Sequence, residues 1–263
     1  MKHKPAFAAS VSLAALVLST ACSSDATAPS QQDAMIEVAP ALAEMSGLGG
    51  GRGTPAAGVP RVNPASCLYS AFSSGFTCPP VTVNGLTITR SFSLFDAAGN
   101  PLSQFTRGAI ATIRQELDIS GTTSRSSANG SGSMTLRRHE VMTSSGLNGT
   151  VHTLNGTGTS SSTGTMTRNG VAAAVTSSGV DTTRNVVIAK SATGSANWPQ
   201  SGTIIHAGTR TTTAAGQNAV THTSRQQLTY NGTSTVTVQV TSDQGTKSCT
   251  RNLAVGGPLS CSP

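Results

Sequence analysis

The chain has 263 residues, of which 36% are hydrophobic, 10% are charged and only 3% are aromatic, and its formal net charge is +7. Nine aromatic residues are too few to build the interfacial girdles of a transmembrane barrel or the stacking platforms of a nucleic-acid-binding groove, which argues against both classes. A folded core must therefore consist of Val, Ile, Leu, Met and Thr side chains, and the length suits one β domain.

The first 21 residues have the layout of a signal peptide. Basic residues at positions 2–4 precede an apolar run over residues 6–18, which is too short for a comfortable membrane span. Small residues then lead directly into Cys22, and this ending resembles the lipobox of bacterial lipoproteins. The resemblance implies that residues 1–21 are removed and that Cys22 is diacylated, so that a lipid anchors the chain in a membrane.

The residue after that cysteine is Ser23 and not Asp. In Gram-negative lipoproteins this pattern implies passage to the outer membrane, with the domain facing the periplasm or the cell exterior. Residues 22–66 are rich in Ser, Ala, Gln, Pro and Gly, and Ser46–Gly51 is their most flexible stretch, so we expect a tether with at most a short helix at Ala41–Met45. A single β domain is predicted over residues 67–263.

Four cysteines remain when Cys22 carries lipid, and an exported chain meets an oxidising environment. We favour the pairs Cys67–Cys78 and Cys249–Cys261, because each closes a short local loop that would add ~3 kcal/mol of stability. Pairing of Cys78 with Cys249 would instead join the two ends of the domain. A metal site is the third possibility, but these cysteines lack both a C-x-x-C spacing and adjacent histidines.

Alternating apolar and hydroxyl residues after Cys78 predict half-buried antiparallel strands. Leu86, Ile88 and Leu94 share one face with Thr or Ser on the other, and the segment from Val236 to Val240 repeats the pattern. Asn-Gly pairs suit type I′ hairpin turns and occur at six places: Asn84-Gly85, Asn129-Gly130, Asn148-Gly149, Asn155-Gly156, Asn169-Gly170 and Asn231-Gly232. Further reversals are predicted at Ser178-Gly179, Ala215-Gly216 and Asp243–Gly245.

Reversals at this spacing predict an all-β fold of about ten to twelve strands in which each strand pairs with the next. We expect an up-and-down antiparallel meander, strongly curved or closed into a barrel, so that its edges are protected. A parallel β-helix is the structural alternative, because Gly156–Thr167 is typical of solenoid turns, although no fixed period repeats.

No catalytic motif is present: the chain lacks G-x-S-x-G, H-E-x-x-H, a P-loop and a strand-linked G-x-G-x-x-G. Glu116 and Asp118 alternate on one strand face and form a conceivable carboxylate pair, but an exposed strand face explains them more simply. A turn at Ala215-Gly216 could bring His206 and His222 together as two metal ligands, without an obvious third. We therefore predict no catalytic residue, no metal and no cofactor.

Arginine is the residue type with a suggestive distribution. From Arg61 onward the chain has fourteen Lys or Arg residues against six Asp or Glu, and twelve of the fourteen are Arg. Such a surface attracts anionic partners. The candidate contacts to an anionic glycan or lipopolysaccharide are Arg137, Arg138, Arg184, Arg210 and Arg225. Trp198, the sole tryptophan, precedes a predicted strand and is interpreted as a plug of the β core, with sugar stacking as the alternative.

These features together predict a non-enzymatic, membrane-tethered lipoprotein with a structural or binding role, and anionic envelope polymers are the partners that we expect. A lipocalin-like carrier of an apolar ligand is the first alternative, with the curved sheet as its cup. A surface module that binds glycans or mediates adhesion is the second alternative, and hydrolase activity comes last.

Overall fold

The computed structural model describes residues 66–106, 108–127, 130–168, 171–190, 198–254 and 259–261. The predicted signal peptide, Cys22 and nearly all of the tether lie outside these residues. The described part contains thirteen strands and no helix. In chain order they are β1 (Leu68–Ser70), β2 (Gly75–Val83), β3 (Leu86–Phe95), β4 (Pro101–Leu102), β5 (Thr112–Ser127), β6 (Gly130–Ser145), β7 (Val151–Arg168), β8 (Val171–Ala189), β9 (Ser201–Ala214), β10 (Val220–Thr229), β11 (Thr235–Ser242), β12 (Gly245–Asn252) and β13 (Ser260–Cys261).

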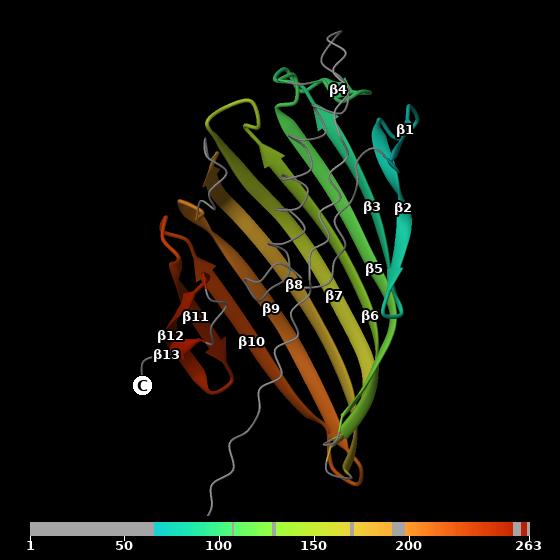
Figure 1. Cartoon of the computed structure of the whole chain (residues 1–263). Helices are drawn as coiled ribbons and strands as arrows, with labels where there is room; N and C mark the ends of the chain where they lie inside the picture. Colours follow the sequence, from blue (N-terminus) through green and yellow to red (C-terminus); the bar gives the residue numbers. More distant parts are fainter. Residues whose placement is uncertain are drawn as a thin grey trace, which may run out of the picture.

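All thirteen strands belong to one antiparallel sheet in which neighbours in sequence are neighbours in space (Figure 1). The one exception is the two-residue strand β4, which pairs with β3 to the side of the main path. The predicted meander is therefore confirmed. The solenoid alternative is wrong, because paired strands run antiparallel instead of stacking as parallel coils.

The sheet is open. Strand β1 forms one edge and β13 the other, and Figure 1 shows them on opposite sides of the molecule. The expectation of a closed barrel or a strongly curled sheet is thus not supported by the described strands. The two edge strands are short: β1 pairs with only Gly75–Thr77 of β2, and β13 with only Cys249 and Thr250 of β12. Among the described strands, the rest of β2 and β12 therefore also forms sheet edge.

Most predicted turns fall between strands. Asn84 and Gly85 join β2 to β3 with φ angles of 51° and 79°, as a type I′ turn requires. Asn148-Gly149, Asn231-Gly232, Ala215-Gly216 and Asp243–Gly245 also lie at strand connections. The Asn129-Gly130 and Asn169-Gly170 turns fall at least partly outside the described residues.

Two predicted reversals are wrong, because Asn155-Gly156 and Ser178-Gly179 lie inside the long strands β7 and β8. Gly156 is required for packing and not for a turn: a Cβ atom there would lie 2.5 Å from the carbonyl oxygen of Val141. At the same level the ladder between β7 and β8 contains an irregularity between Leu154 and Gly156. The side-chain amide oxygen of Asn155 accepts a hydrogen bond of 2.8 Å from the backbone N–H of Asn185, which has a positive φ.

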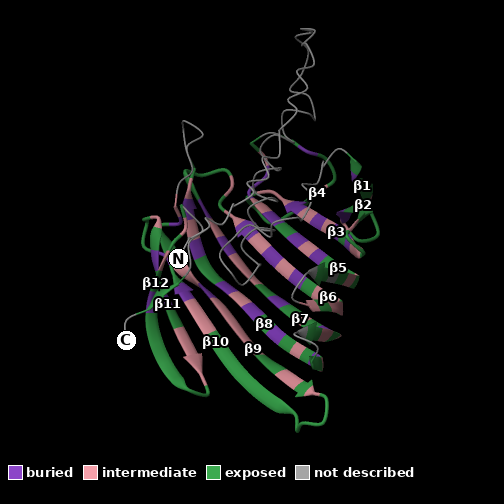
Figure 2. Cartoon of the chain, turned by 60° about the horizontal axis from the view of Figure 1, so that its bottom comes forward, coloured by how far each residue is buried: buried purple, intermediate pink, exposed green. Residues whose placement is uncertain are grey.

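The register aligns buried side chains into rows that cross the sheet, visible as bands on neighbouring strands in Figure 2. One row passes through directly paired residues from β3 to β8: Leu94, Ile113, Ser144, Leu154 and Val186, all 0% exposed. The next row on the same face spans β2 to β12 and includes Phe92, Met142, Ile204, Leu228 and Val238. We call these two rows the apolar strip, and the face that carries them the apolar face.

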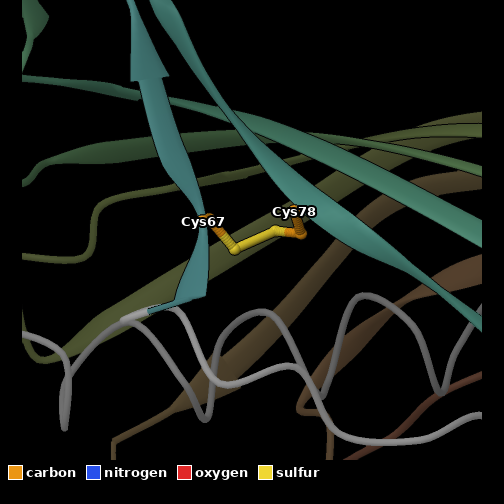
Figure 3. Close-up of a disulfide and its surroundings, with 2 residues drawn as sticks. All are labelled: Cys67 and Cys78. Atoms are coloured by element: carbon orange, nitrogen blue, oxygen red, sulfur yellow. A yellow bond between two sulfur atoms is a disulfide. The ribbon is translucent and has the colours of Figure 1, made fainter.

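Both predicted disulfides are confirmed, Cys67–Cys78 and Cys249–Cys261. In the register of β12 and β13, Cys249 lies directly opposite Cys261. Because Leu68 pairs with Thr77, Cys67 likewise lies across from Cys78, and Figure 3 shows this bridge between adjacent strands. Each edge of the sheet is thus covalently attached to the strand next to it.

Candidate functional site

The two faces of the central strands have different chemistry. Opposite the apolar face, the side chains of β5 to β10 are dominated by Thr and Ser. One row crosses six adjacent strands through directly paired threonines only: Thr122, Thr135, Thr163, Thr176, Thr211 and Thr221. We call this surface the hydroxyl face.

Hydroxyl groups on this face bond to one another across the strands. Thr122 and Thr135 have their hydroxyl oxygens 2.9 Å apart, and Thr211 and Thr221 2.8 Å apart. Ser178 and Thr209 repeat the arrangement at 3.0 Å. Cross-strand Thr and Ser pairs of this kind stabilise a sheet modestly and hold the hydroxyls in a regular array. The face is therefore polar and ordered without being strongly charged.

The five arginines predicted as anion contacts divide between the two faces. Arg137, Arg184 and Arg225 lie on the hydroxyl face and are exposed. Arg138 and Arg210 lie on the apolar face. Successive residues of a strand point to opposite faces, so adjacent Arg137 and Arg138 do not share a surface, and the five candidate contacts cannot all meet one partner on one face.

Arg114 adds a fourth exposed arginine to the hydroxyl face. Among the described residues, no carboxylate forms an ion pair with Arg114, Arg137 or Arg184, whereas Arg225 donates a hydrogen bond of 3.0 Å to the side chain of Gln227. The four lie on β5, β6, β8 and β10. They are distributed along the face and do not converge on one point.

Two acids and a histidine form a cluster beside these arginines. Asp118 of β5 lies opposite His139 of β6, and the His139 Nδ1 atom is 2.8 Å from a carboxylate oxygen of Asp118. Glu116 lies 3.9 Å from the other ring nitrogen. These three could bring ligand atoms within 4.8 Å of one another, but all are substantially exposed, and such acidic groups are common without an ion. We assign no metal to them.

A second charged cluster lies on the apolar face, next to the apolar strip. Arg138 donates hydrogen bonds of 3.2 Å from Nε and 2.9 Å from Nη2 to one carboxylate oxygen of Glu140. The same Nη2 atom lies 3.3 Å from a carboxylate oxygen of Asp181, whose other oxygen is 2.7 Å from Nδ1 of His206. We call these four residues the buried charge cluster.

Gly158 lies between the two acids of this cluster. Glu140, Gly158, Asp181 and His206 are directly paired on the consecutive strands β6 to β9. An added Cβ at Gly158 would lie 3.6 Å from side-chain atoms of both acids, which is an ordinary van der Waals distance. The register therefore places both acids within reach of the guanidinium of Arg138.

The carboxyl groups of the cluster are almost fully removed from solvent, since Glu140 is 3% exposed. Burial raises the pKa of Glu140, and the charge and hydrogen bonds of Arg138 partly offset that increase. Its second carboxylate oxygen, Oε1, is buried and has no hydrogen-bond partner within the described part of the chain. Arg138 is shared by the two acids, so its single positive charge offsets only part of the charge that two carboxylates would carry.

The predicted pairing of His206 with His222 does not form. In the register of β9 and β10, His206 lies opposite Gln226 and His222 lies opposite Arg210, four residues further along the strand. Each histidine has a carboxylate of its own instead: His222 Nδ1 is 2.7 Å from Asp243, and this hydrogen bond lowers the pKa of Asp243.

Burial perturbs two further groups on or beside the apolar face. The pKa of Tyr230 rises to about 12, because the phenol is shielded from water. Burial likewise lowers the pKa of the Arg90 guanidinium. Trp198, predicted to plug the core, is half-buried ahead of β9 and is not part of the hydrophobic core cluster.

No helix in the described residues is long and apolar enough to cross a membrane. No protein-family model matches this chain, nor does any curated protein or solved structure.

The buried charge cluster was not predicted from the sequence, although Arg138 and His206 were considered there separately. The missing signal was parity: Arg138 and Glu140 are two apart and therefore share a face, whereas His139 between them points the other way. Asp181 and His206 could be added only with the register between β8 and β9, and the wrongly placed reversal at Ser178-Gly179 obscured that register.

Proposed function

We propose that this protein is an exported, non-enzymatic lipoprotein, anchored through Cys22 to the outer membrane, whose β domain binds anionic envelope polymers such as lipopolysaccharide. The hydroxyl face is the proposed binding surface. The observation that carries the proposal is the presence of four exposed arginines on one regular Thr and Ser surface, three of them without a carboxylate partner among the described residues.

The chemistry of the face suits a polymer that carries both hydroxyl and anionic groups. Arginine binds phosphate and carboxylate bidentately, and rows of hydroxyls supply donors and acceptors at the spacing of neighbouring strands. Because the arginines are distributed over β5 to β10 and do not converge, an extended ligand fits them better than a small anion. Each contact would be weak and screened by salt, so affinity would depend on several contacts together.

The test compares two double variants that remove the same charge from opposite faces. Arg137→Ala/Arg184→Ala changes the hydroxyl face, and Arg210→Ala/Lys247→Ala changes exposed residues of the apolar face. The probe is purified lipopolysaccharide, with binding by the full-length protein measured at several salt concentrations. We expect the first variant to bind at least about tenfold more weakly and with a shallower salt dependence, and the second to change affinity less than about twofold.

Equal losses of affinity in the two variants would indicate that lipopolysaccharide is attracted by net charge alone, and would contradict binding to the hydroxyl face. Absence of binding by the unaltered protein would overturn the proposal. Binding to an uncharged polysaccharide that survives the arginine substitutions would favour the glycan-binding alternative. Mass spectrometry of the protein from native membranes tests the anchor separately, because a diacyl group on Cys22 is expected.

The lipocalin-like carrier is the second candidate, and the apolar strip favours it. That candidate predicts that a lipid or other apolar molecule co-purifies with the protein from native membranes. Mass spectrometry of an organic extract of the purified protein tests this, and absence of any such molecule would contradict the carrier.

A further inference from the structure

The apolar strip is buried, although no described strand or helix packs against it. All thirteen strands form one sheet, so within the described ranges no second sheet or helix packs on the apolar face. Off the strands, Phe105 and Ile110 of the β4–β5 connection add to the cluster at one end. A sheet face open to water leaves its side chains accessible, yet Ile113, Leu154 and Val186 are 0% exposed.

We propose that the chain covers this strip itself, with residues 33–45 of the N-terminal region as the occupant. This segment is the most apolar part of the chain between Cys22 and the domain. Its large apolar residues are Met35, Ile36, Val38, Leu42 and Met45. Burial of several of them together with the strip would stabilise the contact by ~25 cal/mol for each Å² removed from water.

The connection to the domain is long enough. Residues 46–65 lie between this segment and the first described residue, and an extended chain of that length spans ~66 Å. Nine strand spacings separate β2 from β12, which corresponds to ~43 Å. Cys67, where the chain enters the sheet, already belongs to the same hydrophobic cluster as Leu154. The segment can therefore reach any part of the strip.

The charges are complementary. Residues 33–45 contain Asp33, Glu37 and Glu44 and no Lys or Arg. On the apolar face, Lys247 and Arg251 lie on either side of Cys249 along β12. The Arg251 Nε atom is buried and has no hydrogen-bond partner among the described residues. The described acids that reach this face already have partners: Glu140 and Asp181 contact Arg138, and Asp243 contacts His222. A carboxylate of the segment would supply an acceptor that the face otherwise lacks.

Docking would change how the domain is held. With Cys22 lipidated as proposed above, only ten residues, 23–32, would remain between the anchor and the docked segment. That length spans at most ~35 Å, against ~145 Å for a free tether of residues 23–66. The docked chain would hold the domain near the membrane surface.

A photo-crosslinker tests the occupant in the full-length exported protein. We would replace Ile36 with p-benzoylphenylalanine, irradiate cells, and map the product by mass spectrometry. The expected result is an intramolecular link from position 36 to strip residues such as Met142 or Leu228. The same crosslinker at Gln31 is the control and is expected to give no link to the strip.

Three results would overturn the proposal: a link to a second copy of the chain, a link to a lipid or another protein, or a link to residues of the hydroxyl face. Failure of lipopolysaccharide binding would leave these outcomes unchanged, since they concern the opposite face.

A pair of charge variants gives a second, independent measurement. Ile36→Asp/Val38→Asp adds two charges within the segment, and Gln31→Asp/Gln32→Asp adds the same charge just before it. In the first variant we expect a rise in fluorescence of the apolar dye ANS and at least about tenfold faster amide exchange in β5 to β8. The second variant is expected to resemble the unaltered protein, and equal behaviour of the two variants would contradict the docking.

Discussion

The apolar face and the hydroxyl face are built by the same strands, at alternate residues. Along β7, Leu154 is fully buried, whereas Thr163 projects from the other side into a row of threonines. The backbone ladder is shared, so the difference between the faces lies in the side chains alone. A single-layer sheet can in this way give stability to one surface and leave the other free for binding.

Truncating a buried apolar side chain should give the largest difference in unfolding free energy between variants of the two faces. Leu154→Ala leaves a cavity in a fully buried row, and we expect a loss of about 2–5 kcal/mol in the free energy of unfolding. Thr163→Ala, on the opposite face of the same strand, should change it by less than about 0.5 kcal/mol. Urea unfolding of both variants measures the contrast, and similar losses would show that both faces are packed.

Removal of a disulfide should give the next largest loss; Cys67, Cys78 and Cys249 are buried, whereas Cys261 is exposed. Cys249→Ser/Cys261→Ser opens a loop with a sequence separation of 12, and the chain-entropy relation gives a loss of about 3 kcal/mol. The equivalent change at Cys67 and Cys78, with a separation of 11, should cost nearly the same. A large inequality in thermal unfolding would indicate that one edge unfolds separately from the sheet.

Alkaline pH should lower the free energy of unfolding, because Tyr230 must ionise in a buried position. Its pKa is about 12 in the folded protein and about 10 when unfolded, so its contribution is fully present below pH 10 and is lost as the pH rises towards 12. The two-unit difference corresponds to about 3 kcal/mol. Tyr230→Phe should reduce the decline in unfolding free energy between pH 10 and 12, and an unchanged decline would show that the phenol is accessible to water.

The smallest effect concerns the buried charge cluster. Burial raises the pKa of Glu140, so folding is favoured by its protonated form, and stability should fall as the pH rises from its unfolded pKa of about 4.3 through its folded pKa. Glu140→Gln removes the carboxyl group that titrates. As the pH rises above about 4.3, the unaltered protein should lose stability and the variant should not, so the difference between their unfolding free energies should grow in favour of the variant. Glu116→Gln, at an exposed acid, is the control, and the same slope in both variants would contradict the assignment to Glu140.

The strands were predictable because alternation along one strand is a local property. Leu86 to Leu94 and Val236 to Val240 showed their buried faces without any knowledge of their neighbours. Type I′ turns were equally local at Asn84-Gly85, where both φ angles are positive. The disulfide pairs followed from the short loops that they close.

Long-range features were not predictable for the same physical reason. Gly156 and Ser178-Gly179 have the composition of turns but serve close packing between strands, which depends on residues such as Met142 that are distant in sequence. Whether a sheet closes depends on the sum of its strand twists, and no single segment encodes that sum. The buried charge cluster required the register of four strands.

The disulfides at the two edges also affect whether copies of this chain can associate through their sheet edges. Edge strands β1 and β13 offer only three and two residues as a template for an incoming strand. Reduction would release them and lengthen the unpaired edges by Gly75–Thr77 of β2 and by Cys249 and Thr250 of β12. Backbone groups freed in this way could recruit strands from other molecules into fibres. The two cross-links would thus act as a safeguard against polymerisation for as long as they stay oxidised.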